Sequence, residues 1–116
     1  MEFSVAETFL SLGVADMDRA ATFYSTSLGA VVKWASPRWS SLELAGVRIG
    51  LFGNPVHGGG RVGLHFAVTN LDAACASIEQ AGGKIVCPAS QVAPGVLVAE
   101  VCDTEGNIFS LQKANS

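Results

Sequence analysis

The stretches FLSLGVADMDRAA (residues 9–21) and GLHFAVTNLDAAC (residues 63–75) decide the fold, because they repeat one pattern with a constant offset of 54 between position 9 and position 63. Each stretch begins with alternating apolar residues, which is the period of a half-buried strand. Each then reaches a residue that can cap a helix, Asp16 or Asn70, and continues with apolar residues at helical spacing. The pattern predicts a strand and a helix built twice, so the chain is an internal repeat.

Each predicted helix ends at glycine, at Gly29 and at the Gly82–Gly83 pair, where a left-handed cap is needed. Three strand-like segments follow each helix. We expect them at about 30–35, 39–45 and 47–53 in the first half, and at about 84–88, 95–102 and 107–112 in the second, with a small insertion near 88–95.

The predicted fold is α+β, with two tandem βαβββ units in a single domain over residues 1–116. We place repeat one at about 5–53, a linker at 54–61 and repeat two at about 62–113. A helix covers only one face of each sheet, so the two bare faces should surround a cup-shaped cleft. The cleft can form within one chain or between two.

Composition excludes several classes of protein. Hydrophobic residues make up 49% and charged residues 15%, as in a globular protein. The net charge is −3 with no Lys/Arg cluster, so we expect no nucleic-acid partner. Apolar runs are too short to span a membrane and no secretory signal opens the chain, so a cytoplasmic location is expected. The three cysteines form no C-x-x-C pair, which argues against a disulfide framework or a zinc knuckle.

Several strings carry a family resemblance: LGVADMDRAATFY at 12–24, Leu28-Gly29, QAGG at 80–83 and CDTEGNIFSL at 102–111. They resemble the vicinal-oxygen-chelate superfamily, which includes glyoxalase I, extradiol dioxygenases, fosfomycin-resistance enzymes and bleomycin-resistance proteins. The resemblance covers nearly the whole chain and implies the same tandem βαβββ fold. It implies little about function, because this scaffold hosts many chemistries.

The resemblance also identifies four positions at which metal-dependent members place His, Gln or Glu. In this chain they are Phe9, Gly50, Gly63 and Ser110. None carries an imidazole or carboxylate that could hold a divalent metal. The resemblance therefore implies no metal and no cofactor, as in bleomycin-resistance proteins, which bind and sequester a drug without transforming it.

Strand alternation independently predicts which side chains line the cup. The predicted lining combines aromatic residues with a few polar ones, as small-molecule pockets do. The predicted ligand-binding residues are Phe9, Ser11, Trp39, Arg48, Phe52, His65, Glu100, Ser110 and Gln112.

His65 and Glu100 are the candidates for catalysis, and Arg48 is a candidate for binding an anionic substrate. His65 could act as a general base polarised by Glu100, or it could only orient a ligand or make a structural hydrogen bond. Arg48 could clamp a substrate carboxylate, or it could form an ion pair with Glu43 or Glu100. Both readings stay open for each residue.

Trp34 and Trp39 could stack on a planar or cationic ligand, and packing at a rim or a dimer interface explains them equally well.

The leading hypothesis is a metal-independent protein of the bleomycin-resistance type that sequesters a drug or metabolite, as in antibiotic resistance. A homodimer is expected from the resemblance and from the need to cover sheet edges. A first alternative is a metal-free lyase or isomerase that uses His65 and Glu100. A second is a divergent metal-dependent glyoxalase or dioxygenase, in which Glu7, Glu43, His65 and Glu100 would have to converge.

Overall fold

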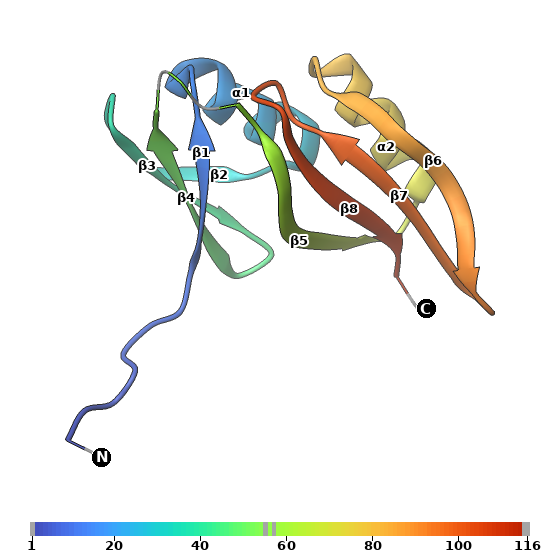
Figure 1. Cartoon of the computed structure of the whole chain (residues 1–116), viewed down its shortest axis with the longest axis horizontal. Coiled ribbons are helices and arrows are strands. Elements are labelled where there is room, and N and C mark those ends of the chain that lie inside the picture. The colour runs from blue at the N-terminus through green and yellow to red at the C-terminus, as the bar shows by residue number, and fades with distance from the viewer. Residues whose placement is uncertain (1, 55, 57, 115–116) are drawn as a thin grey trace.

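The computed structural model describes residues 2–54, 56 and 58–114, so Pro55 and His57 of the predicted linker lie outside the described residues. The described elements form two sheets and two helices, which are arranged as two halves (Figure 1). The first half contains β1 (Leu10–Val14), α1 (Met17–Leu28), β2 (Val31–Ala35), β3 (Trp39–Leu44) and β4 (Val47–Gly53). The second half contains β5 (Gly60–Val68), α2 (Leu71–Gln80), β6 (Lys84–Ala93), β7 (Val96–Cys102) and β8 (Asn107–Lys113).

The two sheets have the same topology. The first has the strand order β1-β4-β3-β2 and the second the order β5-β8-β7-β6. In each sheet the first strand pairs parallel with the last strand of its unit, and the remaining pairs are antiparallel. The α+β fold with two tandem βαβββ units is therefore confirmed.

Both N-terminal caps and the C-terminal cap of α1 lie where the sequence predicts them, whereas α2 has its C-cap at Ala81, just before Gly82 with its positive φ of 99°. The side chain of Asp16 accepts a hydrogen bond from the backbone N–H of Arg19 at 3.0 Å, and that of Asn70 accepts one from Ala73 at 3.0 Å. Gly29 closes α1 in the left-handed region, with φ of 75°. Neither helix in the described part of the chain is long and apolar enough to cross a membrane.

The expected end of the sixth strand near residue 88 is wrong. β6 continues to Ala93 and takes up most of the predicted insertion, although its register against β7 shifts three times. Pro88 does not stop it, because β6 is the edge strand of its sheet and an edge position tolerates a residue without an N–H.

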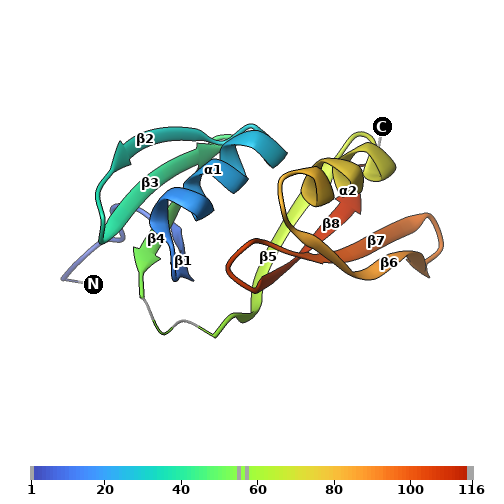
Figure 2. The same ribbon diagram turned by 90° about the horizontal axis from the view of Figure 1, so that it is seen from above.

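The core is shared by the two halves. α1 and α2 contact each other, and Figure 2 shows them side by side in the middle of the molecule. The ring of Tyr24 on α1 packs against Phe109 of the second sheet, with centroids 6.1 Å apart. The hydroxyl of Ser77 on α2 donates to the carbonyl of Ser27 at 2.7 Å. Each helix therefore buries apolar side chains between its own sheet and the other half.

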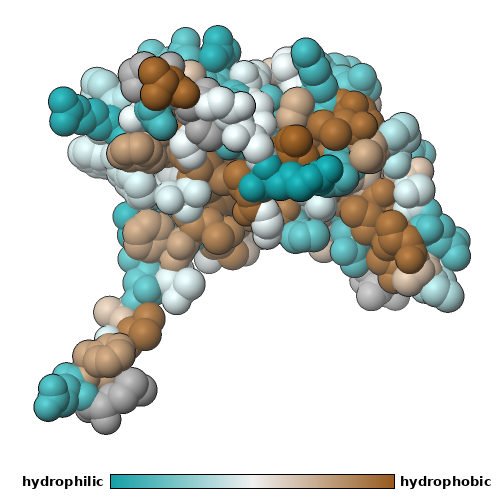
Figure 3. Space-filling view, viewed as in Figure 1, coloured by the Kyte–Doolittle hydropathy of each residue, from teal (hydrophilic) through white to brown (hydrophobic). Residues whose placement is uncertain are grey.

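A groove of about 510 Å³, here called the inter-repeat groove, lies between the first half and β5. On the first half it is lined by Leu10, Val47 and Ile49, which alternate with the cup-side residues and so belong to the α1 side of their sheet. Figure 3 shows apolar residues, in brown, where the two halves adjoin and along the N-terminal arm before β1. The opposite face of the first sheet is thus turned away from the second half.

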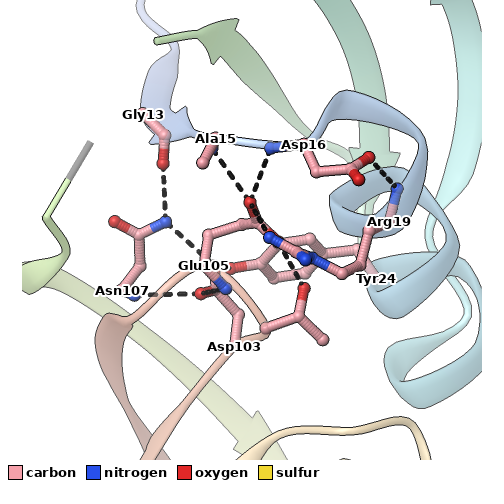
Figure 4. Close-up of polar contacts among 9 residues, drawn as sticks. Gly13, Ala15, Asp16, Arg19, Tyr24, Asp103, Glu105 and Asn107 are labelled. Atoms are coloured by element: carbon pink, nitrogen blue, oxygen red, sulfur yellow. Dashed lines mark hydrogen bonds and ion pairs between the residues drawn. The ribbon is translucent and has the colours of Figure 1, made fainter. Parts of the chain in front are cut away.

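A buried carboxylate joins the halves at one end of α1 (Figure 4). Glu105, in the β7–β8 turn, accepts hydrogen bonds from the backbone N–H groups of Ala15 at 2.9 Å and Asp16 at 2.8 Å. The Arg19 guanidinium forms an ion pair with the same side chain at 2.7 Å, and the Thr104 hydroxyl donates to it at 2.7 Å. Burial alone would raise the pKa of Glu105, but these donors outweigh it and lower the pKa to about 2.

A second carboxylate in the same turn, Asp103, accepts hydrogen bonds from side chains of both halves. Asp103 is buried and accepts a hydrogen bond from the Tyr24 hydroxyl at 2.6 Å. It also accepts from the Asn107 side chain at 2.9 Å, and Asn107 in turn donates to the carbonyl of Gly13 at 2.8 Å. Burial, together with the Asp103 charge, raises the pKa of Tyr24 well above its usual range, so the phenol stays a donor. The end of β1 and the start of α1 are therefore fixed to the second half.

Candidate functional site

The open face of the first sheet, opposite α1, carries the predicted aromatic residues. Strand register places Ser11, Gly50 and Ser41 in one row across β1, β4 and β3. Phe52 and Trp39 face each other in the next row. The sequence placed all of these side chains on one face, and the register agrees.

The Trp39 side chain lies directly over Gly50. A Cβ built on Gly50 would overlap the six-membered ring of the indole. The indole N–H donates to the Ser41 hydroxyl at 3.1 Å, and Phe9 meets the ring edge-on with centroids 6.1 Å apart and planes at 83°. Because Gly50 has no side chain, the indole can lie directly against the strand. This position therefore accommodates Trp39 and provides no side-chain ligand for a metal.

Arg48 completes this cluster from β4. Its guanidinium lies 4.3 Å from the centroid of the Phe9 ring, which is cation–π distance. One of its nitrogens donates to Glu7 at 2.7 Å, and the other is 3.5 Å from the Ser41 hydroxyl. We call Phe9, Trp39 and Arg48 the aromatic platform.

The alternative in which Arg48 pairs with Glu43 or Glu100 is wrong, because its ion-pair partner is Glu7 from the segment before β1. Glu43 instead forms an ion pair with Lys33 at 3.8 Å. Proximity in the sheet favoured Glu43, but Arg48 reaches back along the face over Phe9. The strand pattern does not reveal whether the Arg48 side chain turns towards Glu43 on β3 or towards Glu7 before β1.

Further aromatic side chains extend the platform along the same face. Phe52 is 52% exposed, and Trp34 on the edge strand β2 is 57% exposed opposite Ser41 in the register. Large exposed apolar side chains that share one face of a sheet are typical of a binding surface.

The open face of the second sheet carries the polar candidates. Register places His65, Ser110 and Glu100 in one row across β5, β8 and β7. A pocket of about 260 Å³ is lined by these three side chains together with Arg61. We call it the polar pocket. Gln112 follows Ser110 by two residues on β8 and shares its face.

The expected His65–Glu100 pair does not form. Ser110 lies between them on the middle strand, and Glu100 forms an ion pair with Arg61. Within residues 2–54, 56 and 58–114, the His65 side chain makes no hydrogen bond. His65 therefore stands in the polar pocket without the carboxylate that the sequence suggested for it.

Arg61 is a site residue that sequence reasoning missed. β5 spans four residues from Arg61 to His65 where β8 spans two from Ile108 to Ser110, so β5 bulges. Gly63 lies at this bulge with φ of 61°, in the left-handed region. Alternation was the available signal, because Arg61 is four residues before His65 and therefore has the same parity as His65 and Gly63. The prediction left Arg61 out because it extended the linker to residue 61.

The residues at the four family metal positions do not fit a divalent ion. Phe9 and the two glycines offer no side-chain donor, and Trp39 covers Gly50. The described segments contain no group of three His, Cys, Asp or Glu side chains that could hold a metal. The convergence of Glu7, Glu43, His65 and Glu100 considered above therefore does not occur among them.

The comparisons with known proteins agree with the fold. An enzyme of the glyoxalase/bleomycin resistance protein/dioxygenase family from Burkholderia phytofirmans is 17% identical, with 92% of this chain and 97% of that chain covered and a TM-score of 0.79. TioX from Micromonospora sp. is 20% identical, with 93% and 98% covered and a TM-score of 0.75. A mutant of the fosfomycin resistance protein FosX from Listeria monocytogenes, complexed with Mn(II) and a dihydroxypropylphosphonic acid, is 16% identical, with 97% and 93% covered and a TM-score of 0.80. At these identities the likeness concerns the fold alone.

No curated protein matches the chain significantly in sequence. The family model, in contrast, matches residues 8–111, which is most of the chain. The chain therefore belongs to the Glyoxalase/Bleomycin resistance protein/Dioxygenase superfamily.

Proposed function

We propose that the chain is a metal-independent binding protein that holds a small aromatic molecule and sequesters it without transforming it. The observation that carries the proposal is the Trp39 indole lying over Gly50, one of the family's metal positions. An aromatic surface replaces a metal ligand there, so the face is suited to stacking on a flat ring. The fosfomycin resistance protein among the structural neighbours is consistent with a role in antibiotic resistance, which we include in the proposal with a cytoplasmic setting.

We further propose that the working unit is a homodimer. The aromatic platform lies on the face of the first sheet that is turned away from the second half, whereas the polar pocket lies on the second sheet. A second copy could bring its polar pocket opposite the platform and so close the cup. It would also cover the inter-repeat groove and the strand edges of β1 and β5, which are unpaired in the described structure.

The metal-free lyase or isomerase has less support, because Glu100 is engaged by Arg61 and not by His65. The binding experiments below can still support this alternative. Conversion of a bound compound to product would favour a lyase or isomerase over a sequestering protein.

Thermal unfolding of the protein with a panel of flat aromatic compounds and divalent metals tests the binding proposal. A compound that binds only the folded state adds about 2.7 kcal/mol of stability at a hundredfold excess over its dissociation constant. We expect aromatic compounds to raise Tm, metals to leave it unchanged, and Trp39→Ala to abolish the rise. A metal-specific rise, or no rise with any aromatic compound, would overturn the proposal.

Sedimentation of Val47→Glu tests the dimer. Val47 is 47% exposed in the inter-repeat groove, so a charge there should convert the dimer to monomer. Val92→Glu is the matched control, because Val92 is 64% exposed on β6, away from the groove, and should leave the dimer intact. A wild-type protein that sediments as a monomer at high concentration would contradict the two-chain cup.

A further inference from the structure

We infer that the ligand is an uncharged, flat aromatic molecule that carries hydrogen-bonding groups. This inference rests on the proposed function and names the chemical class that the same cup would select. It follows from how the charged side chains of the two open faces are paired.

Arg48, the basic residue of the aromatic platform, is already paired. Glu7 takes one guanidinium nitrogen at 2.7 Å, the Ser41 hydroxyl is 3.5 Å from the other, and the guanidinium stands over Phe9. A ligand carboxylate or phosphate would have to displace Glu7 before it could form the bidentate contact that makes arginine a good anion clamp. Arg48 therefore supports the Phe9 ring instead of presenting a free positive charge.

The charges of the polar pocket cancel in the same way. Arg61 and Glu100 form an ion pair within the pocket. A ligand ion of either sign would meet a neutral pair there, and it would lose its hydration without gaining an unopposed partner. On the first sheet, Lys33 and Glu43 also form an ion pair at 3.8 Å.

The other four basic side chains lie outside this arrangement. Arg19 is paired with Glu105, and Lys113 borders a cavity beside Asn70 and Asp72. Lys84 is opposite Cys102 on β6, at the other edge of the sheet from the strand that carries His65. Arg38, in the β2–β3 turn, borders a cavity at the Phe52 end of the first face, and the lining of that cavity includes neither Trp39 nor Arg48. None of the four lines the polar pocket.

What remains available is aromatic surface and hydrogen-bonding side chains outside these ion pairs. Trp39 and Phe52 supply the surface, while Ser11, His65 and Ser110 can donate or accept. Carbonyl and hydroxyl groups on a flat ring system match this set, because they need partners but no counter-charge. Binding of such a ligand should depend little on ionic strength.

Three anthraquinones with one ring system and a single differing substituent provide the test: hydroxymethyl, sulfonate and trimethylammoniomethyl. The Trp34→Phe variant leaves Trp39 as the sole tryptophan, so quenching of its fluorescence reports binding. We expect the hydroxymethyl compound to bind at least tenfold more tightly than either charged compound, with less than a twofold change between low and high salt. Equal or tighter, salt-dependent binding of a charged compound would overturn the inference and leave the proposed function standing. Failure of all three compounds and of the wider aromatic panel would overturn both.

A charge-release variant adds a positive test. Glu7→Gln removes the partner of Arg48, so the sulfonate compound should gain at least fivefold in affinity while the hydroxymethyl compound changes little. Glu2→Gln is the matched control, since Glu2 is an exposed acid in the same arm and should alter neither compound. If Glu7→Gln leaves sulfonate binding unchanged, the pairing of Arg48 does not set ligand charge.

Discussion

Replacing Glu105 with alanine is expected to lower the free energy of unfolding by about 3 kcal/mol, because four donors lose a buried acceptor at once. The Glu105 side chain is fully buried, so its loss leaves the backbone N–H groups of Ala15 and Asp16 without their acceptor, whereas Arg19 is half exposed and can bind water instead. A loss of this size should lower Tm by roughly 10 °C or more. Urea denaturation followed by circular dichroism measures it.

Glutamine at position 105 separates charge from shape. Its side-chain oxygen can still accept from Ala15 and Asp16, so Glu105→Gln should destabilise by less than Glu105→Ala. Glu79→Gln is the control, because Glu79 is an exposed acid on α2 and should change stability by less than about 0.5 kcal/mol. Equal stability of wild type and Glu105→Ala would contradict the role assigned to this carboxylate.

The effect of Glu105→Gln on stability should depend on pH in a predictable way. The pKa of Glu105 is about 2 in the folded protein against an ordinary value of 4.5, so its charge stabilises the fold fully above pH 4.5. That contribution is lost as the pH falls from 4.5 towards 2. The stability difference between wild type and Glu105→Gln should therefore be largest at neutral pH and shrink across this interval.

Replacing Gly50 with alanine is expected to expel the Trp39 indole from the sheet surface. The added methyl group would occupy the space of the ring, and the indole would lose its hydrogen bond to Ser41 and its edge contact with Phe9. We expect a destabilisation of about 1–3 kcal/mol, typical of overpacking. Affinity for an aromatic ligand should fall roughly tenfold or more.

Fluorescence makes this change visible. In the Trp34→Phe background, Gly50→Ala should shift the Trp39 emission to longer wavelength as the ring becomes solvated. Gly58→Ala is the matched control, because a Cβ there would meet open space. Unchanged emission and affinity in Gly50→Ala would mean that Trp39 does not depend on this glycine.

The sequence predicted the two repeats, the helix caps and the faces of the strands, because each depends on local periodicity. Leu12 and Ile49 are buried on the α1 side as the alternation requires. The same logic placed Trp39 and Gly50 on one face. It could not reveal that the indole covers Gly50, since that depends on a side-chain rotamer.

The missed features all depend on partners from distant segments. Glu105 binds Ala15 and Asp16 across the two halves, and no spacing along the chain signals such a contact. Arg61 forms its ion pair with Glu100, 39 positions further along the chain. The metal positions could be located in the sequence because the family resemblance identified them. The indole that covers one of them, Gly50, could not be predicted from that resemblance.

The Glu105 bridge exists in only one of the two repeats. The equivalent turn of the first half carries Ala45 before Gly46, so no carboxylate from it can hold the start of α2. The two units of the repeat are therefore unequal in this respect. Glu105 binds the backbone N–H groups of Ala15 and Asp16, whereas Asn70 caps the first turn of α2 without such a bridge among the described contacts. We accordingly expect the first turn of α2 to exchange its amide protons faster than the first turn of α1.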